Sequence, residues 1–158
     1  MYAHAGETWL YMRIDGQIVY VVDDEEIIAK SLAMILNREG FLASPFFDPR
    51  EALASAAKTA PPDLLISDIK MPGMTGVELG IQFRRLYPHC RVLLFSGTAN
   101  TSELLHNSSK DGFEFECLMK PVHPADLLAK IREAPAKARK EPLSESPGDW
   151  LRRYRRRG

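Results

Sequence analysis

The stretch DLLISDIKMPGMTG, residues 63–76, decides the fold. Its first half is a short run of large apolar residues that ends in a carboxylate, Asp68, and its second half is a loop rich in Pro and Gly. An apolar run of this length, bounded by loop residues, is typical of a strand buried on both faces of a parallel sheet. The pattern therefore predicts an acidic side chain at the point where a buried strand ends.

Similar apolar runs recur along the chain, and a segment with helical spacing follows each of them. We expect strands at 18–23, 41–47, 63–68, 91–96 and 113–119. We expect helices at 25–39, after Asp48-Pro49, at 75–87, at 100–110 and after His123. Because strands and helices alternate without a hairpin signal, the predicted fold class is α/β, with a doubly wound five-stranded parallel sheet.

Local signals refine this prediction. Asp48 precedes Pro49 and His123 precedes Pro124, a pairing that favours a helix N-terminus at each place. Pro45 lies inside the second predicted strand and indicates an edge position, because it cannot donate a ladder hydrogen bond. The segment 100–110 has only two large apolar residues among Ser, Asn and His, which predicts a marginal helix.

Polar side chains follow four of the five predicted strands. In open parallel sheets, ligands bind beyond the carboxyl ends of the strands, where the direction of winding reverses. The residues expected at this edge are Asp23, Asp24, Asp68, Ser96 and Lys120. Asp24 has an alternative interpretation as the N-cap of the first helix, and taken singly Ser96 and Lys120 are typical of a loop hydroxyl and a solvated charge.

Three carboxylates in one pocket repel each other, so at least one should have a raised pKa. Mg²⁺ prefers oxygen ligands and commonly takes one or two carboxylates together with a phosphate. In phosphoryl transfer the transition-state charge lies on the peripheral oxygens, which Mg²⁺, Lys120 and the Ser96 hydroxyl could stabilise. A carboxylate that attacks phosphorus would form an acyl phosphate.

Residues 18–134 resemble a response regulator receiver domain, the phosphorylatable module of bacterial two-component signalling. Four motifs match in order: Asp23-Asp24 after a Val-Val strand, Asp68 followed by Met-Pro-Gly-Met-Thr-Gly, Ser96-Gly97, and Lys120-Pro121. Each is weak singly, and their order and spacing make the set specific. The resemblance implies a flavodoxin-like (βα)5 fold.

The resemblance also implies a role for each of these residues. Asp68 would accept the phosphoryl group, and Asp24 and Asp68 would bind Mg²⁺ directly, with Asp23 acting through water. The backbone carbonyl of Lys70 would be a further metal ligand. Ser96 would turn onto the phosphoryl group.

Lys120 would pair with the phosphoryl group, and the Lys120–Pro121 peptide bond would be cis. Two positions depart from the usual pattern. Receivers often carry Tyr or Phe three residues before the Lys, as a switch coupled to the hydroxyl, whereas this chain has Cys117. Lys70 places a cation beside the acceptor, at a position that influences dephosphorylation in the family, so we predict an altered acyl-phosphate lifetime.

Periodicity and charge divide the chain into a predicted N-terminal extension, 1–17, with little periodicity, a receiver domain, 18–134, and a basic C-terminal tail, 135–158. The tail has a net charge of +5 and the remainder −5, although the whole chain is neutral. The Arg-rich end could contact nucleic acid phosphates or an acidic protein, but a short charged run is more often a solvated, flexible tail. Nucleic acid is therefore not an expected partner.

Cys90 and Cys117 show neither metal-ligand spacing nor a disulfide framework, so both are expected to be reduced. Cys90 is expected in a loop without a role, and Cys117 in a strand as a structural residue. No apolar stretch is long enough to span a bilayer, and the N-terminus lacks a secretion-signal pattern, so the predicted location is the cytoplasm.

The resulting hypothesis is a stand-alone phosphoacceptor response regulator, a signalling switch and not an enzyme beyond slow autodephosphorylation. Its partners would be a sensor histidine kinase or histidine phosphotransfer protein and an unknown downstream protein. A homodimer through the fourth helix, fifth strand and fifth helix is a further expectation.

Two alternatives remain. One is a haloacid-dehalogenase-like phosphatase, which also uses an Asp nucleophile and Mg²⁺, although the loop after Asp68 has no explanation under it. The other is an unphosphorylated receiver-like adaptor, against which the intact acidic set argues.

Overall fold

The computed structural model describes residues 16–97 and 101–133. Within them, five parallel strands form one sheet in the order β2-β1-β3-β4-β5. The strands are β1 Ile18–Val22, β2 Leu42–Phe46, β3 Leu64–Asp68, β4 Arg91–Ser96 and β5 Glu116–Met119. The helices are α2 Glu26–Arg38, α3 Pro49–Lys58, α4 Gly76–Leu86, α5 Thr101–Lys110 and α6 Pro124–Arg132. The predicted doubly wound fold is confirmed.

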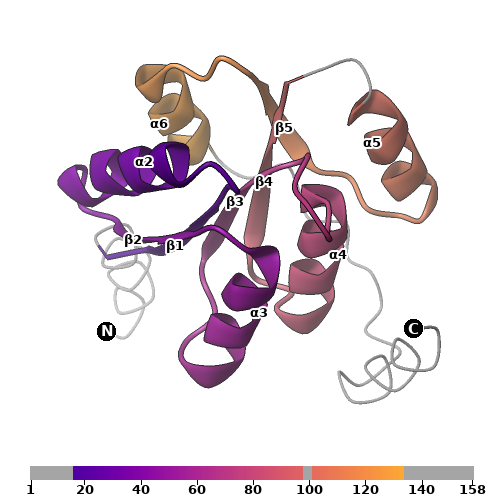
Figure 1. The fold of residues 1–158 in the computed structure, drawn as a ribbon, viewed down its shortest axis with the longest axis horizontal. Coiled ribbons are helices and arrows are strands. Elements are labelled where there is room, and N and C mark those ends of the chain that lie inside the picture. Colours follow the sequence, from indigo (N-terminus) through magenta and orange to yellow (C-terminus); the bar gives the residue numbers. More distant parts are fainter. Residues whose placement is uncertain (1–15, 98–100, 134–158) are drawn as a thin grey trace, which may run out of the picture.

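Helices cover both faces of the sheet (Figure 1). On one face, buried residues of α2 and α6 pack on the side chains of Val19, Val21 and Ile66. On the other face, α3, α4 and the leucines of α5 pack on Leu65 and Leu94. Each central strand thus buries alternate residues in opposite layers of the core, which explains why its sequence is continuously apolar.

The direction of winding reverses at β1, which has β2 on one side and β3 on the other. The parallel register pairs Val22 with Ser67, Asp68 with Phe95, and Ser96 with Met119. The carboxyl ends of four strands therefore lie level along one edge of the sheet. Such a crevice beyond the strand ends is the usual ligand position in open parallel sheets.

The local signals are confirmed where the structure describes them. The Asp48 carboxylate accepts the Arg50 N–H at 2.9 Å, and Nδ1 of His123 accepts the Ala125 N–H at 3.2 Å. Pro45 lies in β2, an edge strand of the sheet. These contacts begin α3 and α6 where the sequence predicted.

The fifth strand is shorter than predicted, because it begins at Glu116 and not at Phe113. Phe113 and Phe115 stack with their ring centroids 6.4 Å apart. The guanidinium groups of Arg85 and Arg84 lie over these rings, at 5.1 and 5.4 Å from the centroids. Packing against α4 therefore takes the place of strand pairing in this segment.

The amino end of the sheet is held by Arg91, whose side chain is 14% exposed. Its guanidinium group donates to both carboxylate oxygens of Glu116, at 2.7 and 2.9 Å. It also donates to the carbonyl oxygens of Lys130, Ile131 and Glu133 at the end of α6. One cation thus joins β4, β5 and the last turn of α6, at the opposite end of β4 from Ser96.

Cys90 lies in the loop before β4, as predicted, but it is 3% exposed and belongs to the core layer beneath α3 and α4, so the prediction that it has no role missed its place in the packing. At the first described residues, the Gly16 N–H donates to the carbonyl of Gly40 in the turn before β2, and the Gln17 carbonyl accepts the N–H of Leu42 in β2. The predicted basic tail, 135–158, lies outside the described residues. No helix in the described ranges combines the length and hydropathy that a bilayer crossing requires.

Candidate functional site

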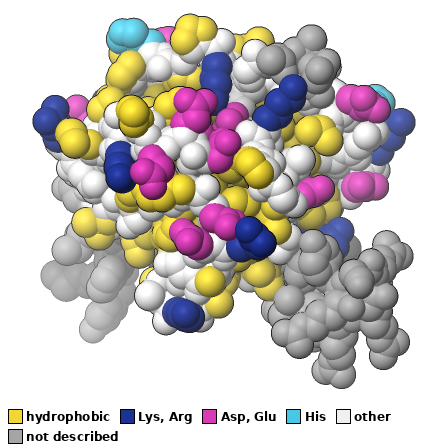
Figure 2. All heavy atoms as spheres, in the orientation of Figure 1, with side chains coloured by type: hydrophobic (Ala, Val, Ile, Leu, Met, Phe, Trp, Pro, Cys, Tyr) yellow, Lys and Arg dark blue, Asp and Glu magenta, His cyan; other side chains and the backbone are white. Residues whose placement is uncertain are grey.

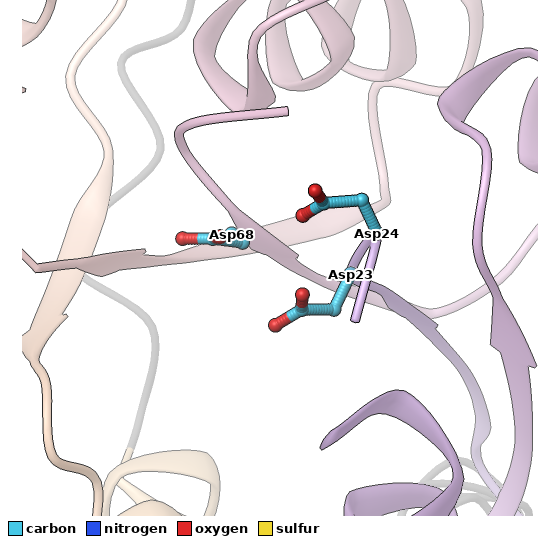
Figure 3. A group of neighbouring side chains, drawn as sticks. All are labelled: Asp23, Asp24 and Asp68. Atoms are coloured by element: carbon cyan, nitrogen blue, oxygen red, sulfur yellow. The ribbon is translucent and has the colours of Figure 1, made fainter. Parts of the chain in front are cut away.

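Three carboxylates meet at the carboxyl edge of the sheet (Figure 3). Asp23 and Asp24 directly follow β1, and Asp68 is the last residue of β3. Each offers an oxygen that lies within 4.8 Å of an oxygen from the other two. Figure 2 shows acidic side chains gathered near the middle of the visible face, with basic side chains beside them. The structure therefore assembles the acidic group expected from the sequence.

Lys120, directly after β5, reaches into this group. Its Nζ lies 3.2 Å from Oδ1 of Asp68 and 3.7 Å from Oδ2 of Asp23. The Lys120 N–H also donates to the Ser96 carbonyl at 2.8 Å, which fixes the lysine backbone beside the end of β4. The Lys120–Pro121 peptide bond is cis, as the resemblance implied.

Asp23 is the most deeply buried of the three acids, at 1% exposed. One of its oxygens, Oδ1, accepts the Glu25 N–H at 2.9 Å. The other, Oδ2, is buried without a hydrogen-bond partner in the described structure. Burial raises the pKa of Asp23, and the neighbouring Asp68 and Asp24 raise it further, while the Glu25 N–H and Lys120 oppose them. The predicted raised pKa in the acidic group is confirmed.

Asp24 does not cap the first helix, so the capping alternative was wrong. The N-cap of α2 is Glu25 and not Asp24, and the Glu25 side chain makes no capping hydrogen bond. Asp24 is exposed and its carboxylate turns toward the other two acids (Figure 3). The side chain is therefore available to the pocket.

Asp68 is positioned by the loop that follows it. Its Oδ1 accepts the Ile69 N–H at 2.9 Å, and its side chain is 12% exposed. Gly76, the first residue of α4, donates to the Ile69 carbonyl at 2.8 Å, so the Pro/Gly loop closes back onto the strand end. Lys70 is an exposed residue of this loop. The acceptor candidate is thus fixed in place and still accessible.

Ser96 ends β4 and is 5% exposed. Its hydroxyl forms a hydrogen bond with the hydroxyl of Thr101, the first residue of α5, which is also buried. No sequence pattern distinguishes Thr101, because a Thr at the start of a polar helix is typical of a cap. Cys117 lies in β5, and the contact described for its thiol is with the Phe115 carbonyl.

The family model for the response regulator receiver domain matches residues 19–132. The chain belongs to this family. The assignment favours the receiver over the haloacid-dehalogenase-like alternative.

Among curated proteins, residues of this chain are 28% identical over 116 residues to the DNA-binding response regulator MtrA of Mycobacterium tuberculosis, covering 73% of this chain and 49% of the relative. They are 31% identical over 117 residues to the DNA-binding transcriptional regulator NtrC of Salmonella typhimurium, covering 74% and 24%. The chain thus spans about half the length of MtrA and about a quarter of the length of NtrC.

Solved structures of receivers have the same fold. The chemotaxis protein CheY4 of Vibrio cholerae has a TM-score of 0.63 and 30% identity, over 74% of this chain and 97% of that one. The response regulator TrrA of Thermotoga maritima, solved in complex with Mg(2+)-BeF, has a TM-score of 0.63 and 26% identity, over 73% and 96%.

Proposed function

We propose that this receiver domain accepts a phosphoryl group on Asp68 in the presence of Mg²⁺ and that the modification switches a protein-binding surface. The observation that carries this proposal is the acidic group itself. One oxygen from each of the three carboxylates lies within 4.8 Å of the others, and the Lys120 ammonium lies 3.2 Å from Oδ1 of Asp68. Helix capping does not explain why the three acids converge, because Asp24 is not the N-cap of α2.

The donor set fits Mg²⁺. A hard cation takes carboxylate oxygens and retains several waters, and the partnerless buried Oδ2 of Asp23 is an acceptor suited to such a water. Asp24 and Asp68 would hold the ion directly, Asp23 through water, and the Lys70 carbonyl would complete the protein ligands. When bound, Mg²⁺ supplies positive charge that offsets the carboxylates and that stabilises phosphoryl oxygens.

The remaining chemistry belongs to side chains of this chain. An oxygen of Asp68 attacks the phosphorus of a phosphohistidine in line, the new O–P bond forms as the P–N bond breaks, and the histidine ring leaves. Lys120 is close enough to Asp68 to pair with an oxygen of the bound phosphoryl group. The Ser96 hydroxyl would donate a hydrogen bond to another oxygen of the phosphoryl group. The Mg(2+)-BeF complex of TrrA, a protein of the same fold, supports this assignment.

A phosphorylation experiment tests the proposal directly. Wild-type protein is incubated with acetyl phosphate and Mg²⁺, and intact mass is followed. We expect a gain of one phosphoryl group that requires Mg²⁺ and that Asp68→Asn abolishes. Labelling that survives in Asp68→Asn, or no labelling of a folded wild type, would refute the proposal. Multiple turnover of a generic phosphomonoester would instead favour the phosphatase alternative.

The Lys70 side chain offers a second test of the site. Its ammonium group lies two residues after the acceptor in an exposed loop, where it can act on the acyl phosphate or on an approaching water. We expect Lys70→Ala to change the hydrolysis rate of the phosphorylated protein. Unchanged hydrolysis would dismiss this role.

The partners follow from the family. A sensor histidine kinase or a histidine phosphotransfer protein would supply the phosphoryl group, in the cytoplasm. Output would use the face formed by α5, β5 and α6, where Met119 is 71% exposed, either toward a downstream protein or in a homodimer. The stand-alone expectation is not confirmed by the relatives, because MtrA and NtrC are DNA-binding regulators.

A further inference from the structure

The hydrogen bond between Ser96 and Thr101 joins the proposed phosphoryl site to α5. Ser96 is the last residue of β4, and Thr101 is the first residue of α5. Their hydroxyl groups are in hydrogen-bond contact, and the two residues are 5% and 2% exposed. A buried hydroxyl that loses its partner carries a desolvation cost, so this pair resists separation.

Strand alternation places the Ser96 side chain on the other side of the sheet from Asp68. In β4, Leu93 and Phe95 belong to the core layer beneath α2 and α6, whereas Leu94 belongs to the layer beneath α3, α4 and α5. Ser96 lies two positions after Leu94, so its side chain points to the same layer, where its hydroxyl bonds to Thr101 of α5. Asp68 follows Ile66, which belongs to the layer beneath α2 and α6.

The Ser96 hydroxyl therefore has two competing positions. In the structure it bonds to Thr101, and under the proposed function it must instead donate to a phosphoryl group on Asp68. The position that often carries an aromatic switch in the family is Cys117, whose described thiol contact is with Phe115 of its own segment. Thr101 is thus a described hydrogen-bond partner through which a movement of Ser96 can reach a surface helix.

The composition of α5 makes it sensitive to this contact. Its buried residues are Thr101 and Ser108, both polar, and its two leucines are only partly buried. A helix with so little buried apolar surface depends strongly on each anchoring contact. Loss of the hydrogen bond with Ser96 would loosen the first turn of α5.

We infer that Thr101 is a positioning residue that holds the Ser96 hydroxyl away from the phosphoryl site and transmits its departure to α5. This inference rests on the proposed function. Filling the site with a phosphoryl group draws the Ser96 hydroxyl from Thr101, and α5 responds. Removing the Thr101 hydroxyl removes the competitor, so a phosphoryl analogue binds more tightly and α5 responds less.

Beryllofluoride with saturating Mg²⁺ serves as the probe, in a titration of the full chain followed by amide NMR. We expect Thr101→Val to tighten beryllofluoride binding by about two- to tenfold, the factor expected from one net hydrogen bond. In wild type, the amides of α5 shift on binding, and in Thr101→Val this ligand-induced shift is smaller. Thr101→Ser keeps the hydroxyl and should restore wild-type behaviour.

Two controls separate coupling from a structural effect. Thr59→Val removes an exposed hydroxyl at the end of α3, remote from the site, and should change nothing. In a Ser96→Ala background, Thr101→Val should no longer alter affinity, because a double-mutant cycle isolates the pairwise contribution. Thermal melts of each variant verify that it is folded.

The outcomes distinguish this inference from the proposed function. If folded wild-type protein does not bind beryllofluoride in a manner that requires Mg²⁺ and Asp68, the proposed function fails and this inference with it. If wild type binds but Thr101→Val has the same affinity and the same α5 shifts, this inference alone is overturned. A Thr101→Val effect that persists in the Ser96→Ala background also overturns it, and so does failure of Thr101→Ser to restore wild-type behaviour.

Discussion

Replacing Gly76 with Ala should damage the acidic site through the backbone of Asp68. A Cβ atom at position 76 would lie 2.0 Å from the Asp68 carbonyl oxygen, 2.9 Å from its carbonyl carbon and 3.0 Å from the Ile69 Cα. All three neighbours are backbone atoms, so no side-chain rotation relieves the overlap. The end of β3 and the start of α4 must therefore separate.

The size of the effect follows from these distances. Ordinary contact begins at 3.4 Å, so the two segments must move apart by about 1.4 Å. The start of α4 resists this movement, because Thr75 and Glu78 form a reciprocal capping box there. Overpacking typically costs about 1–3 kcal/mol of unfolding free energy, and a clash with backbone atoms alone is expected at the upper end of this range. Metal sites tolerate displacements of only a few tenths of an ångström, so we expect Mg²⁺ affinity to fall at least about tenfold.

Gly73→Ala is the matched control. Gly73 lies in the loop between β3 and α4 with a φ of +80°, and a Cβ atom there would meet nothing within 4 Å. Its cost is the left-handed backbone of a non-glycine residue, about 1–2 kcal/mol, without displacement of Asp68.

Urea unfolding without Mg²⁺ measures the unfolding free energy of each variant. The gain in unfolding free energy when Mg²⁺ is added reports its affinity, because a ligand that binds only the folded state adds to its stability. If Gly76→Ala retains wild-type stabilisation by Mg²⁺, the argument from backbone overlap is refuted.

Three further predictions concern buried polar groups. Asp23→Asn should raise the melting temperature of the metal-free protein and abolish most stabilisation by Mg²⁺. Burial raises the pKa of Asp23 in the fold, so the ionised carboxyl destabilises the metal-free fold above that raised pKa, and acidification toward the ordinary pKa of 3.8 relieves the penalty. Urea unfolding as a function of pH checks the sign. Arg91→Met should lower the unfolding free energy by about 3–5 kcal/mol, because it leaves the largely buried carboxylate of Glu116 and three carbonyls without their donor. Burial raises the pKa of the Cys90 thiol to about 12, so alkylation in native buffer at pH 8 should modify Cys117, which is less buried, before Cys90.

Each of these has a contradicting result. An unaltered or lower melting temperature for metal-free Asp23→Asn would show that the buried charge carries no net cost. A loss of less than about 0.5 kcal/mol for Arg91→Met would place the guanidinium among surface ion pairs of little energetic weight. Modification of Cys90 at the rate of an unfolded thiol would contradict its burial.

The sequence by itself determined the fold class and the positions of the site residues. Apolar runs such as 63–68 and helical spacing such as that of 25–39 are local patterns, and they report which residues face the core. Because the carboxyl ends of parallel strands share one edge, the polar residues after those runs had to lie near one another. Asp23, Asp68 and Lys120 could therefore be grouped from the sequence alone.

Only the tertiary structure decided which partner each polar group has. Packing between segments distant in sequence buries the partnerless oxygen of Asp23 and places Cys90 in the core. The hydrogen bond of Ser96 to Thr101 depends on the side-chain rotamers that the two residues adopt. Tertiary packing also sets the late start of β5, because Phe115 packs on α4 where the sequence pattern predicted strand pairing. Periodicity records the average environment of a residue, whereas hydrogen-bond partners and burial of single atoms are set by three-dimensional contacts that the periodicity does not encode.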